Sequence, residues 1–159
     1  GQPFTVALGF DNALLGDATP FFSQRPDRVP GEPMVLGPRR GPDLRLNPAA
    51  FAVPPVGQFG NLGRNVLRGP GFGQFDLGLT KETELAEGVK LQVRAEFFNL
   101  FNHPNFALPT ETANLGVALT SPEKFGVSTS TVNSQNQQLG AIFAPGGPRS
   151  IQLAIKLTY

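Results

Sequence analysis

The sequence predicts an all-β fold, an antiparallel meander of amphipathic strands joined by long loops rich in proline and glycine. The clearest evidence is the stretch 89–97, in which apolar and polar residues alternate without interruption. A period of two over this length indicates a strand with one apolar face and one wet face. Glycine and proline, with 19 and 16 copies among 159 residues, favour irregular loops over helices. No apolar run reaches the roughly 18 residues that a transmembrane helix needs.

Composition and charge exclude several classes of function. Charged residues make up only 16% of the chain and the formal net charge is +1, so no electrostatic footprint indicates nucleic-acid binding. Cysteine is absent, which excludes a disulfide framework and a thiolate metal site. The length suffices for one domain with a hydrophobic core. The chain starts at Gly1 without Met or a signal peptide, and we therefore expect a piece of a longer protein.

Five segments have the alternation expected of strands. They lie near residues 2–10, 74–83, 89–100, 125–132 and 150–159. The second and third flank a charged turn and are expected to form an antiparallel hairpin. In the last strand, one face carries the apolar residues Ile151, Leu153, Ile155, Leu157 and Tyr159.

Long loops separate these strands. The segment 11–55 is rich in proline and its charges lean basic. A loop of this length is usually functional or disordered, so it is either a solvated loop or one that contacts a ligand or partner. The glycines of segment 57–73 resemble a phosphate-binding loop, but no Lys-Ser or Lys-Thr follows them and Pro70 removes a backbone donor. We therefore reject a phosphate site and expect these glycines to allow tight turns. Segment 107–124 is expected to be a loop with one helical turn.

An aromatic corner follows the strand 89–100. Pro104 cannot donate to a strand ladder and asparagines favour turns, so the strand should end there. The corner lacks charge, which suits a strand end at a membrane interface better than a hairpin tip in water. Its candidate interface residues are Phe98, Asn99, Leu100, Phe101, Asn102, His103 and Pro104.

A soluble β-sandwich would show similar alternation, so other features must separate it from a membrane barrel. The strands approach the roughly 9–11 residues that cross a bilayer when tilted. Their wet faces are small or polar, which suits a hydrated lumen, and aromatic residues gather at strand ends as in an interfacial girdle. These features favour a transmembrane β-barrel.

We find no catalytic, cofactor-binding or metal-binding motif and expect no enzyme activity. His103, the only histidine, stands alone and is better explained as a turn or interface residue. The aspartates of the first loop are too irregularly spaced for a calcium loop. A candidate polar cluster in the lumen consists of Asp76, Arg94 and Glu96, which would form either an ion-pair network or part of a substrate path.

Several stretches together resemble a known family. The run 63–72 (GRNVLRGPGF), the following FDLGLTKE at 75–82 and the run 94–106 (RAEFFNLFNHPNF) resemble the C-terminal barrel portion of TonB-dependent outer-membrane receptors. The similarity is greatest to the Oar-like group, which has an N-terminal carboxypeptidase-regulatory-like domain. The starting stretch, the Asp11-Asn12 pair and the ending 149–159 are similar to that group as well, although a terminal Phe is more usual than Tyr159.

The resemblance implies a fold, a location and partners. It implies a barrel of about 22 strands around an internal plug in the bacterial outer membrane. It places the aromatic corner at the periplasmic rim and ends the last strand at the periplasm, where its alternating apolar residues and terminal aromatic resemble the signal read by the barrel-assembly machinery. Outer-membrane lipid, the rest of the barrel, its plug and, through the plug, TonB would be partners. No plug and no TonB box are present in these residues, so we expect the last strands of a longer receptor.

Two functions from different classes remain open. In the first, the chain forms part of the barrel of a TonB-dependent transporter or receptor for a bulky ligand such as a siderophore, an oligosaccharide or a peptide. The second is a β-rich structural or adhesive module that self-associates through its strand edges. Lipid-facing strands should make the purified chain depend on detergent, whereas a soluble module should stay monodisperse without it.

Overall fold

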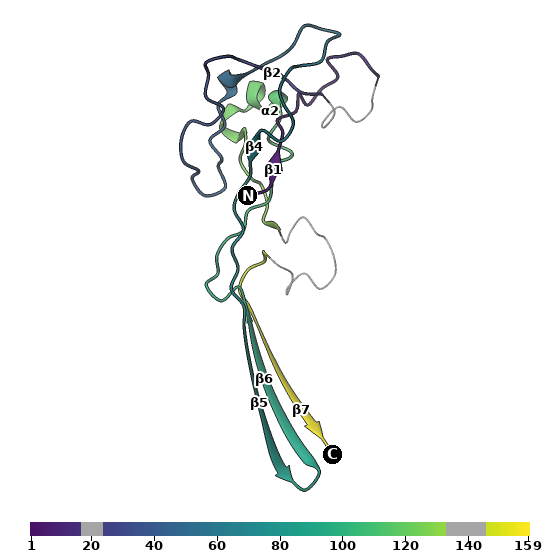
Figure 1. The fold of residues 1–159 in the computed structure, drawn as a ribbon, viewed down its shortest axis with the longest axis vertical. Helices are drawn as coiled ribbons and strands as arrows, with labels where there is room; N and C mark the ends of the chain where they lie inside the picture. The colour runs from purple at the N-terminus through teal and green to yellow at the C-terminus, as the bar shows by residue number, and fades with distance from the viewer. Residues whose placement is uncertain (17–23, 133–145) are drawn as a thin grey trace. The chain divides into compact units, whose positions relative to one another are not determined.

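The computed structural model describes residues 1–16, 24–132 and 146–159, and its long elements are all strands (Figure 1). The chain divides into two compact units: unit 1 comprises Gly1–Gly71 and Phe106–Ser130, and unit 2 comprises Phe72–Asn105 and Thr131–Tyr159. The predicted all-β, antiparallel fold is confirmed. None of the helices in the described ranges is long and apolar enough to cross a membrane.

Unit 2 is built on a three-stranded antiparallel sheet in the order β5-β6-β7. Its strands are β5 (Leu77–Ala86), β6 (Val89–Phe98) and β7 (Ser150–Thr158). The tight turn at Glu87 and Gly88 joins β5 to β6, and Gly88 supplies the positive φ of 76° that this turn requires. The predicted hairpin is therefore present, although β5 begins and ends later than the expected 74–83, and a register shift between Glu84 and Ala86 follows its centre.

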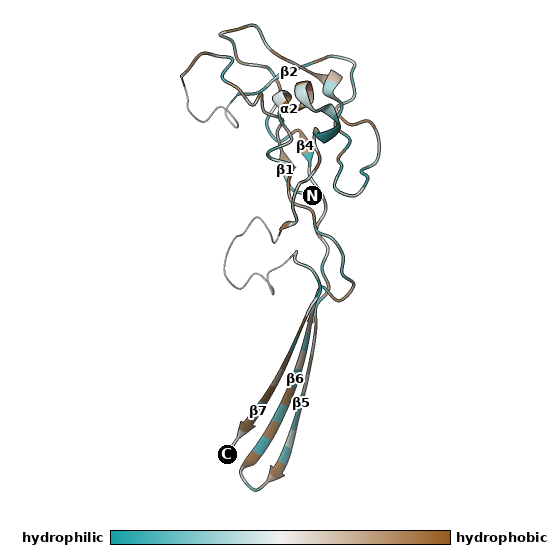
Figure 2. Ribbon diagram, turned by 180° about the vertical axis from the view of Figure 1, so that it is seen from behind, coloured by the Kyte–Doolittle hydropathy of each residue, from teal (hydrophilic) through white to brown (hydrophobic). Residues whose placement is uncertain are grey.

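In this register, mainly apolar residues lie on one face of all three strands, and mainly polar or small residues lie on the other. Leu79 lies opposite Ala95, which lies opposite Leu153. On the other face, Glu96 lies between Gly78 and Gln152. Figure 2 shows the resulting alternation of hydrophobic and hydrophilic residues along β5 and β6. A slip of one residue would place every side chain on the opposite face, so the alternation itself specifies this register.

Unit 1 contains short elements around a small core. Strand β1 (Pro3–Phe4) pairs with β4 (Leu67–Arg68), and β2 (Asp27–Arg28) pairs with β3 (Phe51–Ala52). The helical turns are the 3₁₀ turns η1 (Pro48–Ala50) and η2 (Pro122–Lys124) and the short helix α2 (Leu115–Thr120). The buried apolar residues of the core are Phe4, Val6, Leu8, Leu44, Leu46, Ala50, Phe51, Leu62, Leu67, Ala113, Leu115, Ala118 and Phe125.

Two of the expected strands are wrong in extent or in kind. The segment 2–10 is a strand only at Pro3–Phe4. Val6 and Leu8 are both fully buried, but the chain turns at Gly9, whose φ is +83°, so its alternation serves a globular core. The segment 125–132 is not a strand. Gly126 has a φ of +77°, a conformation that interrupts a strand immediately after the buried Phe125.

Segment 11–55 is only partly a solvated loop: residues 35–41 are exposed, as that interpretation expects, whereas the stretch 44–51 contributes buried residues. Leu44, Leu46 and Phe51 are buried in the core of unit 1. Asn47 begins the η1 turn, because its side-chain oxygen accepts a hydrogen bond from Ala49 N at 3.1 Å. Residues 17–23 of this segment lie outside the described residues. The helical turn expected in 107–124 is present as α2.

Candidate functional site

The apolar face of the β5–β7 sheet is strongly exposed. Leu153 and Ile155 of β7 are 74% and 76% exposed, and Leu79 of β5 is 55% exposed. Apolar surface of this extent is unfavourable in water, at about 25 cal/mol for each Å². The strands have 10, 10 and 9 residues, close to the roughly 9–11 that cross a bilayer when tilted. The sheet is therefore suited to face lipid.

One residue of β5 interrupts this apolar face. Lys81 lies opposite Val93, whose other neighbour is Ile155. Lys81 lies within the expected strand 74–83, and the register of β5 (Leu77–Ala86) places it on the apolar side. A lysine at this position can keep its stem along the apolar surface while its ammonium group extends toward a polar interface.

The opposite face of the sheet carries the charges. Arg94 Nη2 lies 2.5 Å from Glu96 Oε1, so two members of the candidate lumen cluster are paired. Lys90 Nζ lies 3.8 Å from Glu82 Oε1, across β5 and β6. Arg94, Lys90 and Glu82 have side chains that are more than half exposed, and Glu96 is partly exposed, so each pair contributes little to stability and the face is a hydrated surface.

The third member of that cluster, Asp76, is held elsewhere. Its carboxylate accepts hydrogen bonds from Gln74 Nε2 at 2.8 Å and from Asn99 N at 2.8 Å. The expected grouping of Asp76 with Arg94 and Glu96 is therefore not seen. Asp76 lies just before β5, and Asn99 is the first residue after β6. The hydrogen bond between them therefore fixes the end of β6.

Asn99 is the central residue of the aromatic corner. It is 2% exposed and has a φ of +49°, a left-handed conformation that asparagine tolerates better than most residues. Its side-chain oxygen accepts from His103 N at 2.9 Å, and its amide nitrogen donates to His103 O at 3.0 Å and Gly147 O at 2.8 Å. One side chain thus joins the corner to the segment that leads into β7.

Two further asparagines complete the corner. Asn102, with a φ of +51°, accepts from Arg149 N at 3.1 Å. Asn105 is fully buried and accepts from Gly73 N at 2.8 Å. Asn105 was not among the predicted site residues, although it is the third asparagine of one seven-residue stretch, and this density was the available signal.

The aromatic side chains of the corner differ in exposure: Phe98 is half-buried, whereas Phe101 and His103 are exposed. Phe101 is 75% exposed and packs on Phe75, with ring centroids 5.5 Å apart. His103 is exposed and takes part in the corner through its backbone groups, which bond to Asn99. Pro104 is exposed, while Leu100 is half-buried and donates its N–H to Phe75 O at 2.9 Å. Within the described ranges, no three His, Cys, Asp or Glu side chains are grouped so that they could hold a metal ion.

The corner and the last residue of the chain lie at opposite ends of the same sheet. Phe98, just before the corner, pairs with Ser150 at the start of β7. Thr158, at the end of β7, pairs with Lys90 beside the tight turn at Gly88. The expectation that the corner and the chain end share the periplasmic rim is therefore wrong, because antiparallel pairing separates them by the length of the strands.

The terminal strand has the face that its pattern predicted. Every member of its apolar set is exposed, including Ile151 at 56% and Leu157 at 54%. Tyr159 lies just beyond the end of β7 and is 97% exposed. Both β5 and β7 are edges of the described sheet, so each presents one side without a strand partner in unit 2.

The exposed apolar face, the polar opposite face and the strand lengths define a class of protein, the outer-membrane β-barrels. The family model described as an outer membrane beta barrel domain matches residues 1–152, and the chain belongs to this family. Its location is accordingly the bacterial outer membrane. No curated protein and no solved structure matches the chain.

Proposed function

We propose that this chain supplies the last strands of the barrel of a TonB-dependent outer-membrane receptor of the Oar-like group, which takes up a bulky ligand. The observation that carries the proposal is the exposed apolar face of β5–β7 on strands of membrane-crossing length. The runs 63–72 and 94–106, which resemble that group, support the narrower assignment.

The unpaired edges of the sheet support a larger barrel. A sheet of three strands cannot close on itself, and membrane barrels need about eight strands or more. In lipid an open edge would leave backbone N–H and C=O groups without partners, at a cost of several kcal/mol for each. Strands β5 and β7 would therefore pair with further strands of the barrel.

The proposal assigns an orientation and partners. With the end of β7 at the periplasm, the turn at Gly88 is periplasmic and the asparagine corner faces the cell exterior. The apolar residues of β7 and Tyr159 would be read by the barrel-assembly machinery. The polar face around Arg94 and Glu96 would line the lumen beside a plug, and TonB would act through that plug. The role is transport without catalysis, for a siderophore, an oligosaccharide or a peptide.

The test is the mass and solubility of the native polypeptide. An antibody against residues 89–106 would recover it from outer-membrane fractions for intact mass spectrometry. A species several times heavier than 16.9 kDa that needs detergent to remain monodisperse is expected. A native species of 16.9 kDa that is monodisperse without detergent would overturn the proposal and favour the self-associating structural module.

A further inference from the structure

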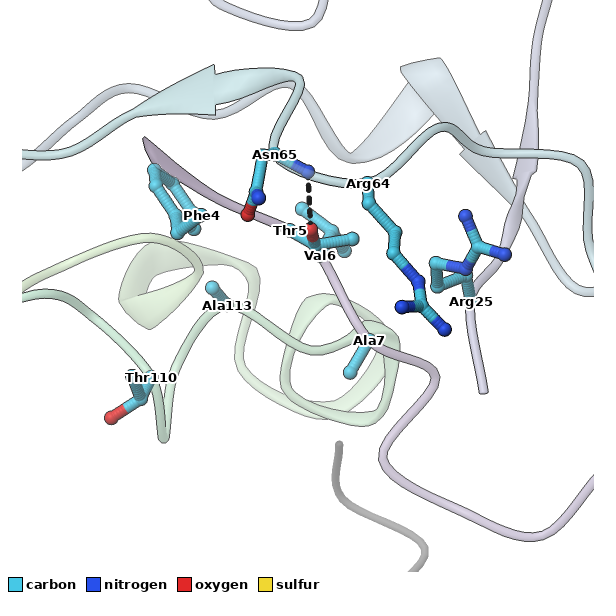
Figure 3. Close-up of a pocket in the computed structure, with 9 residues that line it drawn as sticks. All are labelled: Phe4, Thr5, Val6, Ala7, Arg25, Arg64, Asn65, Thr110 and Ala113. Atoms are coloured by element: carbon cyan, nitrogen blue, oxygen red, sulfur yellow. Dashed lines mark hydrogen bonds between the residues drawn. The ribbon is translucent and has the colours of Figure 1, made fainter. Parts of the chain in front are cut away.

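Unit 1 contains a cavity of about 510 Å³ that the proposed transport function does not use (Figure 3). This volume lies within the range of about 300–1,000 Å³ that is typical of small-molecule sites. Four separate parts of unit 1 line it: residues 4–7, Arg25, the pair Arg64 and Asn65, and the segment 110–113 through Thr110 and Ala113.

The walls of the cavity are held by bonds within unit 1. Asn65 N donates to Thr5 Oγ1 at 2.6 Å, which joins the β1 and β4 sides of the opening (Figure 3). Ala7 N donates to Ala113 O at 3.1 Å on the other side. Arg25 is half-buried and donates from Nη1 to Leu62 O at 2.5 Å. A cavity with its walls fixed in this way is preformed, which lowers the entropy cost of binding.

The charges at the cavity are of one sign. Figure 3 shows the side chain of Arg64 extending toward Arg25. Within the described part of the chain, no carboxylate lies within 4.0 Å of either guanidinium group. Arg64 is exposed and makes no hydrogen bond to the described residues, so all five of its N–H donors are available. Two neighbouring cations without a counter-charge favour the binding of an anion.

The rest of the lining is largely apolar. Phe4, Val6 and Ala7 contribute one wall and Ala113 another (Figure 3). Val6 is fully buried and Phe4 is 7% exposed, so these side chains belong to the core and present a rigid surface. An apolar body lying against this wall would place a terminal anionic group near the arginines.

We propose that this cavity binds a small organic carboxylate with an apolar body. Arg64 takes the carboxylate through paired N–H donors, Arg25 adds the second positive charge, and the wall formed by Phe4 and Val6 packs against the apolar part. Arginine suits this role because its planar donors match the two oxygens of a carboxylate. The site requires only the fold of unit 1, and it is independent of the proposed receptor function.

The test uses two probes that differ only in charge, N-acetylphenylalanine and its C-terminal amide, with the full chain in detergent. Ligand-observed NMR titration measures the Kd of each. The carboxylate is expected to bind about tenfold more tightly than the amide. Arg64→Gln should remove this preference, whereas the matched control Arg68→Gln should retain it, because Arg68 is exposed on β4 but does not line the cavity.

Equal binding of the two probes to the native chain, or no binding of either, would overturn the inference. Equal losses in Arg64→Gln and Arg68→Gln would also overturn it, since they would indicate general attraction to positive charge. These outcomes leave the receptor proposal unaffected, because that proposal is judged by the mass and detergent dependence of the native polypeptide.

Discussion

At the scale of single residues, asparagines stabilise the corner because they tolerate a left-handed backbone and have a short amide that reaches nearby backbone groups. Asn99 and Asn102 both adopt left-handed backbone conformations, and each uses its short amide to bond to backbone groups. The two differ in burial, because Asn99 is 2% exposed whereas Asn102 is exposed. This difference allows backbone strain and side-chain bonding to be separated by experiment.

Asn99→Ala should destabilise the corner by about 2–3 kcal/mol, because it leaves the buried carbonyl of Gly147 without its donor and removes the bonds to His103. Asn102→Ala places alanine in a similar left-handed conformation but removes only one exposed hydrogen bond. Apart from the strain common to both variants, it should lower the stability of the corner by about 1 kcal/mol or less. Amide hydrogen exchange at Leu100 N, which bonds to Phe75 O, measures both local losses. Equal effects would show that backbone strain alone governs the corner.

Asp11 provides a prediction on pH dependence. The hydrogen bond from Gln24 Nε2, at 2.5 Å, is the main reason that the pKa of Asp11 lies below its ordinary value of 3.8. Desolvation opposes this shift, and the backbone bonds from Leu15 N and Gly16 N add to it. A lowered folded-state pKa stabilises the fold above the ordinary value, and this contribution is lost as pH falls through the folded-state pKa.

An NMR titration of the Asp11 carboxyl should therefore give a midpoint below 3.8. Asp11→Asn should flatten the pH dependence of unfolding in the acid range below about pH 5, since the variant has no carboxyl to protonate. A titration midpoint at or above 3.8 would contradict the bonding seen around Asp11.

At the scale of elements, the two faces of β6 should respond oppositely to the same change. Val93 lies on the apolar face between Lys81 and Ile155, whereas its neighbour Gln92 lies on the polar face between Glu82 and Lys156. A lipid-facing arginine near the middle of a barrel strand costs about 2–4 kcal/mol, and one on the lumen side costs far less.

Val93→Arg should thus lower the stability of the native protein in lipid vesicles by about 2–4 kcal/mol, measured by urea titration. Gln92→Arg, its matched control on the adjacent residue, should change stability by less than about 1 kcal/mol. The reverse order of effects would mean that the charged face contacts lipid. Similar large losses in both variants would mean that both faces are packed against protein.

At the scale of the whole molecule, the antiparallel register sets which ends of the strands share a side of the membrane. The corner at Phe101 and the turn at Glu87 lie at opposite ends of the sheet. If the chain ends at the periplasm, the corner is exterior. Both residues are exposed and these 159 residues contain no cysteine, so each variant adds one thiol to them; the unsubstituted native protein serves as the labelling control.

Phe101→Cys should react with a membrane-impermeant maleimide on intact cells, whereas Glu87→Cys should react only after the outer membrane is permeabilised. Labelling is read as a mass shift of the recovered protein. The opposite pattern would place the corner at the periplasm and reverse the proposed orientation, while leaving the fold of the sheet intact.

The strands of the sheet were predictable because their alternation is nearly complete. In β6 and β7, consecutive residues alternate between the apolar and the polar face, and the structure shows this alternation. The same signal failed in segments 2–10 and 125–132, where the alternating residues enter a globular core and glycines with positive φ turn the chain. Alternation alone does not distinguish a strand from a short bent segment with buried apolar residues.

The candidate sites were only partly predictable. Arg94 and Glu96 pair because they are two residues apart on one face, which sequence spacing reveals. Asp76 is not part of the expected cluster, and its carboxylate instead accepts a hydrogen bond from Asn99 N at 2.8 Å, a contact between residues 23 positions apart that spacing does not reveal. The cavity with Arg25 and Arg64 had no sequence signal, because these arginines lie far apart in the chain and only the packing of unit 1 brings them together.

The sequence by itself determined the β class and the faces of the long strands, because period and strand length are local properties of the chain. The outer-membrane location came from the resemblance of its motifs to a known family, which the family match supports. Tertiary structure decided that β7 pairs with β6, that Leu44, Leu46 and Phe51 of segment 11–55 enter the core of unit 1, and that the corner lies opposite the chain end. These are long-range properties. They depend on contacts between residues far apart in the chain, which no local pattern specifies.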